Sequence, residues 1–141
     1  MRFMMLMMPK GYEKAQPGAV PDAKTVAVMM KYNEALQKAG VLLALDGLHP
    51  PSMGARVIFS GGKPKVTDGP FTEAKEVIGG YWMIQVKSKA EAVEWASRCP
   101  ASDNEVIELR QVMEMAEFPA DVQEAATGFP ELQGRPGRNV S

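Results

Sequence analysis

The sequence contains very little of the two residue types most common in metal and redox centres. Cys99 is the single cysteine of the chain and His49 the single histidine. One cysteine excludes an intrachain disulfide and any iron–sulfur or zinc site built from several thiolates, and it is typical of proteins in a reducing cytoplasm. One histidine among scattered carboxylates forms no recognisable metal-ligand spacing. We therefore expect a cytoplasmic protein with no metal site and no cofactor.

The chain also lacks an excess of one charge and any long apolar run. Lys and Arg number 16 against 17 Asp and Glu, for a net charge of −1. This balance argues against nucleic acid as a partner, because binding to a phosphate backbone needs a basic surface. No window reaches the roughly 20 apolar residues of a membrane span, so we expect no membrane association. A length of 141 residues suits one domain, without separate cofactor and substrate domains.

What the chain does contain is an alternation of predicted strands and helices. Four apolar segments predict strands, at residues 3–8, 41–45, 78–86 and 106–112. Helical spacing after two N-cap residues, Asp22 and Ser88, predicts helices over residues 22–40 and 88–99. A hairpin that turns at Gly61-Gly62 is inserted between the second and third strands. This order predicts an α+β fold, a ferredoxin-like βαββαβ sandwich with an inserted β-hairpin and both helices on one sheet face.

The first strand suggests an oligomer, because both of its alternating sets of side chains are apolar. Two helices cover only one face of a sheet, and an apolar second face in water is an association site. We therefore expect a homodimer with two sheets packed face to face. The side chains expected to be buried in it are Met5, Met7, Tyr81 or Met83. The strand at residues 41–45 is apolar almost throughout, and we expect it to be buried on both faces.

The predicted domain covers residues 1–115. Residues 116–141 form a C-terminal extension, which we expect to be helical around residues 121–126 and flexible at its Pro/Gly-rich end.

Polar residues cluster on both sides of the hairpin, with Asp46 and His49 before it and Asp68 after it. A turn centred on Gly61-Gly62 makes Ala55 oppose Asp68, which brings His49 and Asp68 to the same base. A carboxylate that orients an imidazole forms a general acid–base pair. The alternative is structural, with Asp68 capping backbone amides of a turn and His49 an ordinary loop residue.

The run at residues 66–76, which contains Asp68-Gly69-Pro70-Phe71 and is followed by Gly79-Gly80-Tyr81-Trp82, resembles the signature of the DGPF-domain branch of the YCII-related proteins. Further matches lie at residues 39–42, 47–50 and 91–96, so the resemblance covers residues 1–115 in order. It implies a ferredoxin-like fold and a dimer of the α+β barrel type.

For function, the resemblance implies less. Most of the family has no established activity, a His–Asp pair in a cleft is the proposed catalytic feature of YCII-like members, and the motif's Asp corresponds to Asp68. The His of better-studied members lies in the first helix region, which has none here, so His49 is the candidate. One relative eliminates chloride from a chlorinated hydroxyhydroquinone. Bacterial DGPF proteins are often encoded beside extracytoplasmic-function sigma factors.

Two hypotheses of different classes follow. The first is a small-molecule-binding dimer or small enzyme in which Asp68 and His49 transfer protons. Its ligand-binding candidates are Asp46, Phe71, Glu73, Tyr81 and Arg110. The alternative is a non-catalytic regulatory or interaction module associated with extracytoplasmic-function sigma factor systems.

Overall fold

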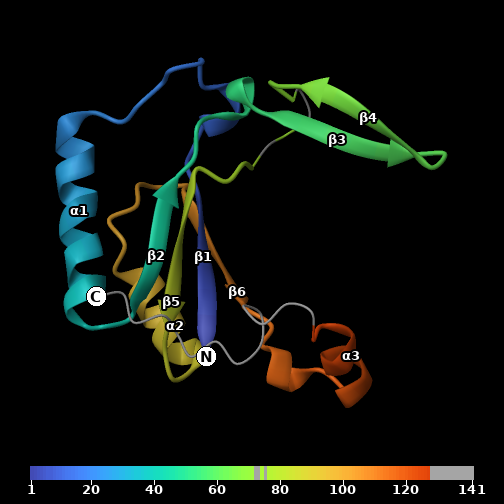
Figure 1. Cartoon of the computed structure of the whole chain (residues 1–141). Coiled ribbons are helices and arrows are strands. Elements are labelled where there is room, and N and C mark those ends of the chain that lie inside the picture. The colour runs from blue at the N-terminus through green and yellow to red at the C-terminus, as the bar shows by residue number, and fades with distance from the viewer. Residues whose placement is uncertain (72–73, 75, 128–141) are drawn as a thin grey trace.

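The computed structural model describes residues 1–71, 74 and 76–127, and it shows an α+β fold with two antiparallel sheets (Figure 1). The strands of the larger sheet are β1 (Arg2–Met8), β2 (Leu42–Gly47), β5 (Gly80–Gln85) and β6 (Val106–Gln111). Their order across the sheet is β2-β5-β1-β6, and each neighbouring pair is antiparallel. This arrangement is compatible with the ferredoxin-like fold expected from the sequence.

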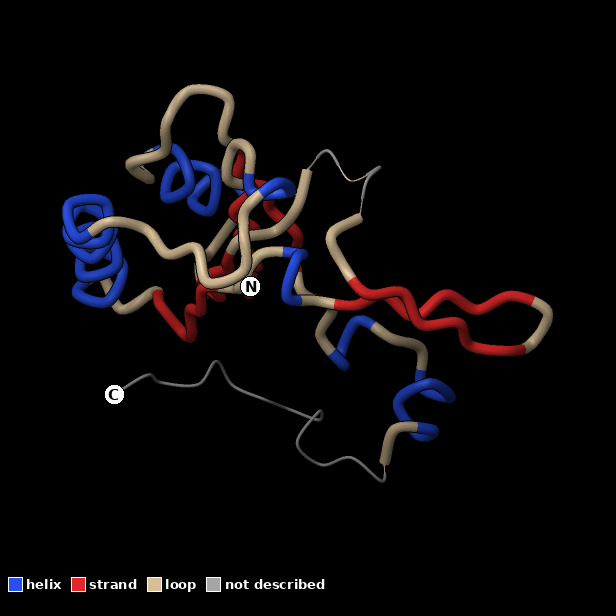
Figure 2. The backbone as a smooth tube through the Cα atoms, turned by 90° about the horizontal axis from the view of Figure 1, so that it is seen from above, coloured by secondary structure: helices blue, strands red, loops and turns tan. Residues whose placement is uncertain are grey.

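Two helices, α1 (Ala23–Lys38) and α2 (Lys89–Ser97), lie on one side of this sheet, and Figure 2 shows the other side free of them. Both start at the predicted N-caps. The Asp22 carboxylate accepts a hydrogen bond from the Thr25 amide at 2.7 Å, and the Ser88 hydroxyl accepts one from the Glu91 amide at 3.1 Å. These bonds satisfy amides that have no partner inside the helix, so each helix begins at a defined residue.

Alternate residues of the two central strands face the helices and form the core. On β1 these are Phe3, Met5 and Met7, and the core continues through Trp82 and Ile84 of β5. The expectation that Met5 and Met7 lie on the uncovered face was therefore wrong. Both alternating sets of β1 are apolar, so the strand pattern alone did not distinguish the two faces.

The opposite side of the sheet, which we call the open face, carries side chains that are only half-buried. They are Met4, Leu6 and Met8 of β1 with Tyr81 and Met83 of β5. No helix of the described residues packs over their centre (Figures 1 and 2). This is where the expected apolar second face lies.

The prediction for residues 41–45 was also wrong. β2 is an edge strand that pairs only with β5, and it is exposed from Ala44 onward. Val41 and Leu42, where the strand begins, pack on the core. A run of apolar residues indicates a strand, but it does not show whether that strand lies at the centre or at the edge of the sheet.

The inserted hairpin consists of β3 (Ala55–Ser60) and β4 (Lys63–Asp68) and forms a separate two-stranded sheet. Its register confirms the predicted one, since Ala55 pairs with Asp68. Gly61 and Gly62 have φ of 58° and 77°, the left-handed backbone that a two-residue hairpin turn requires. The hairpin projects from the body on the side opposite the helices (Figure 2).

Three short 3-10 helices connect these elements: η1 (Tyr12–Lys14), η2 (Pro51–Met53) and η3 (Met115–Glu117). A last helix, α3 (Ala120–Ala125), overlaps residues 121–126, where the sequence predicts one. The Arg2 guanidinium holds this C-terminal part against the sheet through two hydrogen bonds to the Glu114 carboxylate, at 2.7 and 3.0 Å. This pairing lowers the pKa of Glu114. No helix among the described residues is long and apolar enough to cross a membrane.

Trp82 joins the sheet to both helices. Its indole N–H donates a buried hydrogen bond of 2.8 Å to the Asn33 side-chain oxygen, and the Tyr32 ring meets it edge-on with centroids 5.7 Å apart. The Tyr32 hydroxyl in turn donates to the Trp95 carbonyl of α2 at 2.7 Å. A polar contact in the core thus sets how α1 and α2 sit on β5.

Replacing Asn33 with Ala leaves the Trp82 indole N–H buried without an acceptor. We expect Asn33→Ala to lower the free energy of unfolding by about 2 kcal/mol in urea denaturation. Gln37→Ala is the control, because Gln37 lies one turn further along α1 and is exposed; its effect should stay within about 0.5 kcal/mol. Equal losses in the two variants would contradict a special role for the Asn33–Trp82 bond.

Candidate functional site

Residues 68–71, which we call the DGPF turn, leave β4 and pack against η2. An added Cβ on Gly69 would lie 1.8 Å from the Pro51 carbonyl oxygen, so only glycine fits there. The Gly69 amide also donates to the Gly54 carbonyl at 2.9 Å. The backbone of the turn and of η2 are therefore in direct contact at the base of the hairpin.

Gly79 and Gly80 both lie very close to neighbouring segments of the chain. A Cβ on Gly79 would meet the Pro9 ring at 2.6 Å, and one on Gly80 would lie 3.0 Å from the Asp46 carbonyl oxygen. The loop after β1 is thus pressed against the start of β5.

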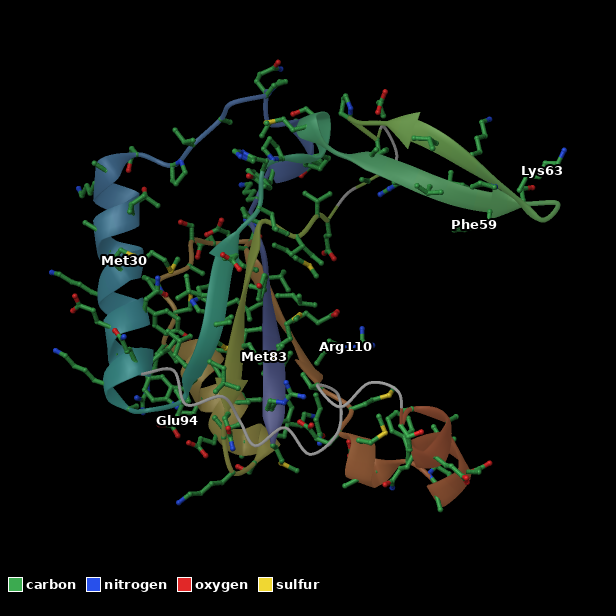
Figure 3. The ribbon with its side chains drawn as sticks, in the orientation of Figure 1. Met30, Phe59, Lys63, Met83, Glu94 and Arg110 are labelled. Atoms are coloured by element: carbon green, nitrogen blue, oxygen red, sulfur yellow. The ribbon has the colours of Figure 1, made fainter. Side chains whose placement is uncertain are left out.

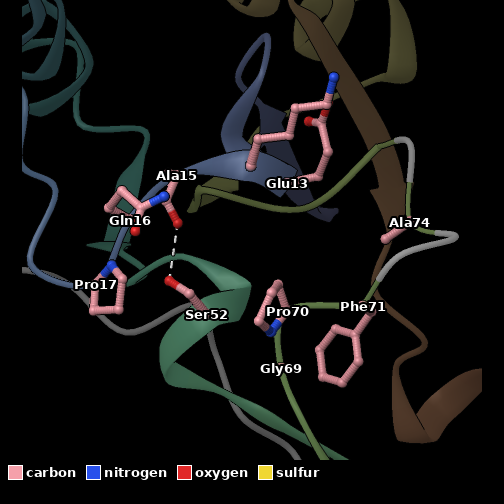
Figure 4. Close-up of a pocket in the computed structure, with 10 residues that line it drawn as sticks. Glu13, Ala15, Gln16, Pro17, Ser52, Gly69, Pro70, Phe71 and Ala74 are labelled. Carbon is pink, nitrogen blue, oxygen red and sulfur yellow. Dashed lines mark hydrogen bonds between the residues drawn. The ribbon is translucent and has the colours of Figure 1, made fainter.

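A cavity of about 760 Å³ lies between the loop after β1 and the DGPF turn (Figure 4). Residues 13–17 form one wall, Ser52 of η2 another, and Gly69, Pro70, Phe71 and Ala74 a third. The Ser52 hydroxyl donates to the Ala15 carbonyl at 2.9 Å and joins two of these walls. This volume is within the range of about 300–1,000 Å³ that small-molecule sites occupy.

Phe71 is half-buried at the edge of this cavity, and the Arg56 guanidinium lies 4.1 Å from the centre of its ring. The contact between a cation and an aromatic face holds the first residue pairs of the hairpin over the DGPF turn. Phe71 thus has a structural contact on one side and the cavity on the other.

His49 and Asp68 both lie at the hairpin base, and both are exposed. Within the described part of the chain, no hydrogen bond or ion pair joins the two side chains, and neither lines the cavity. Each lies within two residues of the contact between Gly69 and Pro51. The segment before His49 is held at Leu48, whose amide donates to the Gly79 carbonyl at 2.9 Å.

The remaining ligand-binding candidates lie elsewhere, on or beside the open face. Asp46 pairs with Tyr81 across β2 and β5, and the Tyr81 hydroxyl donates to its carboxylate at 2.7 Å. Arg110 of β6 is exposed, two strands away from Tyr81, and lies 3.6 Å from the Glu108 carboxylate. Glu73 lies outside the described residues. The candidates thus divide between the hairpin base and the open face.

Sequence reasoning missed the cavity walls formed by residues 13–17 and by Ser52. The breaker-rich loop after β1 predicts irregular backbone, but no local pattern tells where such a loop packs. Only the run Pro50-Pro51-Ser52 gave a signal, because prolines favour a fixed turn there.

Cys99 does not suit nucleophilic catalysis. The thiol is half-buried between α2 and β6, and burial, with a smaller contribution from the Glu105 carboxylate, raises its pKa to about 11. The thiol is therefore protonated at neutral pH, whereas the thiolate is the reactive form. No cluster of His, Cys, Asp and Glu within the described ranges could hold a metal ion.

Residues 1–116 match the YCII-related domain. The chain belongs to the YCII-related family. It is 39% identical over 70 residues to an uncharacterized protein of Rhizobium meliloti (strain 1021), a match that covers 50% of this chain and 53% of the relative. The match thus spans about half the length of that curated relative. Because that relative is uncharacterized, the similarity assigns no activity to this YCII-related domain.

The Asp46–Tyr81 pair of the YCII-related domain has a measurable consequence. The hydrogen bond to the Asp46 carboxylate raises the pKa of Tyr81 above its ordinary value, because only the protonated phenol can donate it. We expect Asp46→Asn to lower the pKa of Tyr81 toward 10.0, as followed by NMR of the tyrosine ring carbons against pH. Glu108→Gln is the control, since Leu6 of β1 lies between Glu108 and Tyr81. A Tyr81 titration unaffected by Asp46→Asn would show that the pair does not form.

Proposed function

We propose that this YCII-related protein binds a small molecule in the cavity between the loop after β1 and the DGPF turn. The cavity itself is the observation that supports the proposal. Its volume suits a ligand of modest size, and three separate segments of the chain converge on it. We also assign the chain to the DGPF branch of the family, on the motif Asp68-Gly69-Pro70-Phe71.

The lining favours an aromatic or hydroxylated ligand. Phe71, Pro17 and Pro70 offer flat apolar surfaces against which a ring can pack. Ser52 and Gln16 supply hydrogen-bonding groups within the same walls, which suit hydroxyl substituents.

Asp68 and His49 are the proposed proton-transfer groups for such a ligand. Asp68 directly precedes the lining residue Gly69. His49 lies two residues before Pro51, which contacts Gly69. For proton transfer both side chains would have to turn toward a bound hydroxyl group, an adjustment that catalytic groups in ligand-free enzymes commonly make.

Phenol is a suitable first probe of the cavity. In a titration followed by amide NMR, we expect the shifts to concentrate at Ser52, Gly69 and Ala74. Ala15→Trp, which places an indole ring in the cavity, should abolish them. Ala19→Trp, on an exposed residue of the same loop outside the lining, should retain them.

Two further variants test whether the side chains proposed for proton transfer also contribute to binding. Asp68→Asn and His49→Gln should leave phenol binding unchanged, because neither side chain lines the cavity. Shifts that persist in Ala15→Trp would contradict the cavity as the binding site.

We propose in addition that the protein is a homodimer that buries the open face. The support is the row of half-buried apolar side chains there, which a second sheet would cover. We expect sedimentation at micromolar concentration to give twice the 15.3 kDa mass of the chain. Met83→Glu should give monomers, whereas Val28→Glu, on the exposed side of α1, should not. A monomeric parent protein would contradict the dimer.

The alternative, a non-catalytic interaction module, is favoured by one observation. The hairpin exposes apolar side chains along its whole length, among them Phe59 at 76% and Val66 at 65% exposure. Exposed apolar surface of this kind indicates a binding partner.

A further inference from the structure

The hairpin has one apolar face and one polar face. Directly paired residues point to the same side of a two-stranded sheet, so the pairs Val57–Val66 and Phe59–Pro64 share a face. We call these four residues the apolar hairpin face. The other face carries Lys63 with Ser60, Lys65 with Ile58, and Arg56 with Thr67.

The apolar hairpin face has nothing over it in the described part of the chain. Every residue of β3 and β4 is exposed, and Figure 3 shows Phe59 and Lys63 near the tip, far from the core. A two-stranded hairpin alone is marginally stable in water and normally needs a surface to pack on. We therefore expect another protein surface to pack on the apolar hairpin face.

The C-terminal segment, residues 113–126, has the complementary character. It contains four acidic residues and no basic one, whereas residues 55–67 of the hairpin contain three basic residues and no acidic one. Met113 is 74% exposed and Val122 41%, so the segment also offers apolar surface. The two hydrogen bonds between Arg2 and Glu114 fix its start against the sheet.

The two segments lie at opposite ends of the open face. β2 runs parallel to β1 and leads to the hairpin, while β6 runs antiparallel to β1 and leads to η3 and α3. Strands of this length separate the two ends by about 20 Å. Figures 1 and 2 show both segments on the side of the sheet opposite the helices, so both flank the open face.

A two-fold axis relates these ends in a simple way. When two copies face each other through their open faces and the axis runs across the strands, the hairpin of one copy lies over the C-terminal segment of the other. The contact then forms twice. Packing of hairpin on hairpin would instead bring like charges together, which is unfavourable.

We infer that the apolar hairpin face of one copy docks on the C-terminal segment of a second copy, with the basic residues of the hairpin at the rim beside the acidic residues of the segment. The inference rests on the proposed dimer and names the contact that holds its two ends. Because Lys side chains are long, Lys63 and Lys65 reach around a ribbon only two strands wide.

Charge reversal tests this contact. The hairpin variant combines Lys63→Glu with Lys65→Glu, and the segment variant combines Asp121→Lys with Glu124→Lys. We expect each alone to weaken the dimer by about tenfold or more in sedimentation, because acidic then meets acidic or basic meets basic. Lys24→Glu with Lys38→Glu, both exposed at the ends of α1, is the control for the hairpin variant, with the same change in net charge.

Mixing the hairpin variant with the segment variant makes the test specific. In the mixed dimer both contacts again join opposite charges, so we expect native mass spectrometry to show the heterodimer as the main species. If the hairpin instead packed on the C-terminal segment of its own chain, mixing the two variants would not favour the heterodimer.

The apolar side is tested with neighbouring residues on opposite faces. Phe59→Ser removes the largest side chain of the apolar hairpin face and should weaken the dimer. Ile58→Ser, at the next position and 51% exposed on the other face, should weaken it much less.

The outcomes separate this inference from the dimer on which it rests. If the parent is a dimer that Met83→Glu dissociates, but the hairpin variant behaves like the α1 control or the mixed variants do not pair, the inference is wrong and the dimer stands. If the parent is monomeric at all concentrations, both are wrong.

Discussion

The buried hydrogen bond from Trp82 to Asn33 decides how the helices sit on the sheet. It fixes α1 against β5, and the Tyr32 hydroxyl extends the contact to the backbone of α2. With both helices held on one face, the alternation of β1 and β5 divides their side chains into a core set and an open-face set. The apolar open face, and the segments that flank it, follow from this one-sided packing.

Several features of the fold could be predicted because they depend on local rules. The N-caps Asp22 and Ser88 define where the helices start, and the Gly61-Gly62 turn sets the hairpin register. The assignment of faces failed on β1, where Met5 and Met4 are equally apolar although one is core and the other is on the open face. Which face the helices cover is a property of the whole fold, and the alternation of residues along one strand does not reveal it.

The candidate site was predictable to a similar extent. The hairpin register correctly brings the segments around His49 and Asp68 to one base. The Pro51 carbonyl explains Gly69 and the Pro9 ring explains Gly79, because neither leaves room for a Cβ. The walls contributed by Ala15 and Ser52 were not predictable, because they meet through a hydrogen bond between loops 37 residues apart. Contacts of that kind leave no periodic trace in a sequence.

The net charge of −1 conceals how the charges are distributed along the chain. Residues 55–67 of the hairpin carry only basic charges and residues 113–126 carry only acidic ones, and these charges nearly cancel in the total. A near-neutral composition argues against a polyanion as partner, yet opposite charges separated into two exposed segments are well suited to pairing between copies of one chain. Because the segments lie at opposite ends of one face, a single copy cannot join them over a strand length of about 20 Å. A second copy, turned by a two-fold axis, presents each segment with its complement.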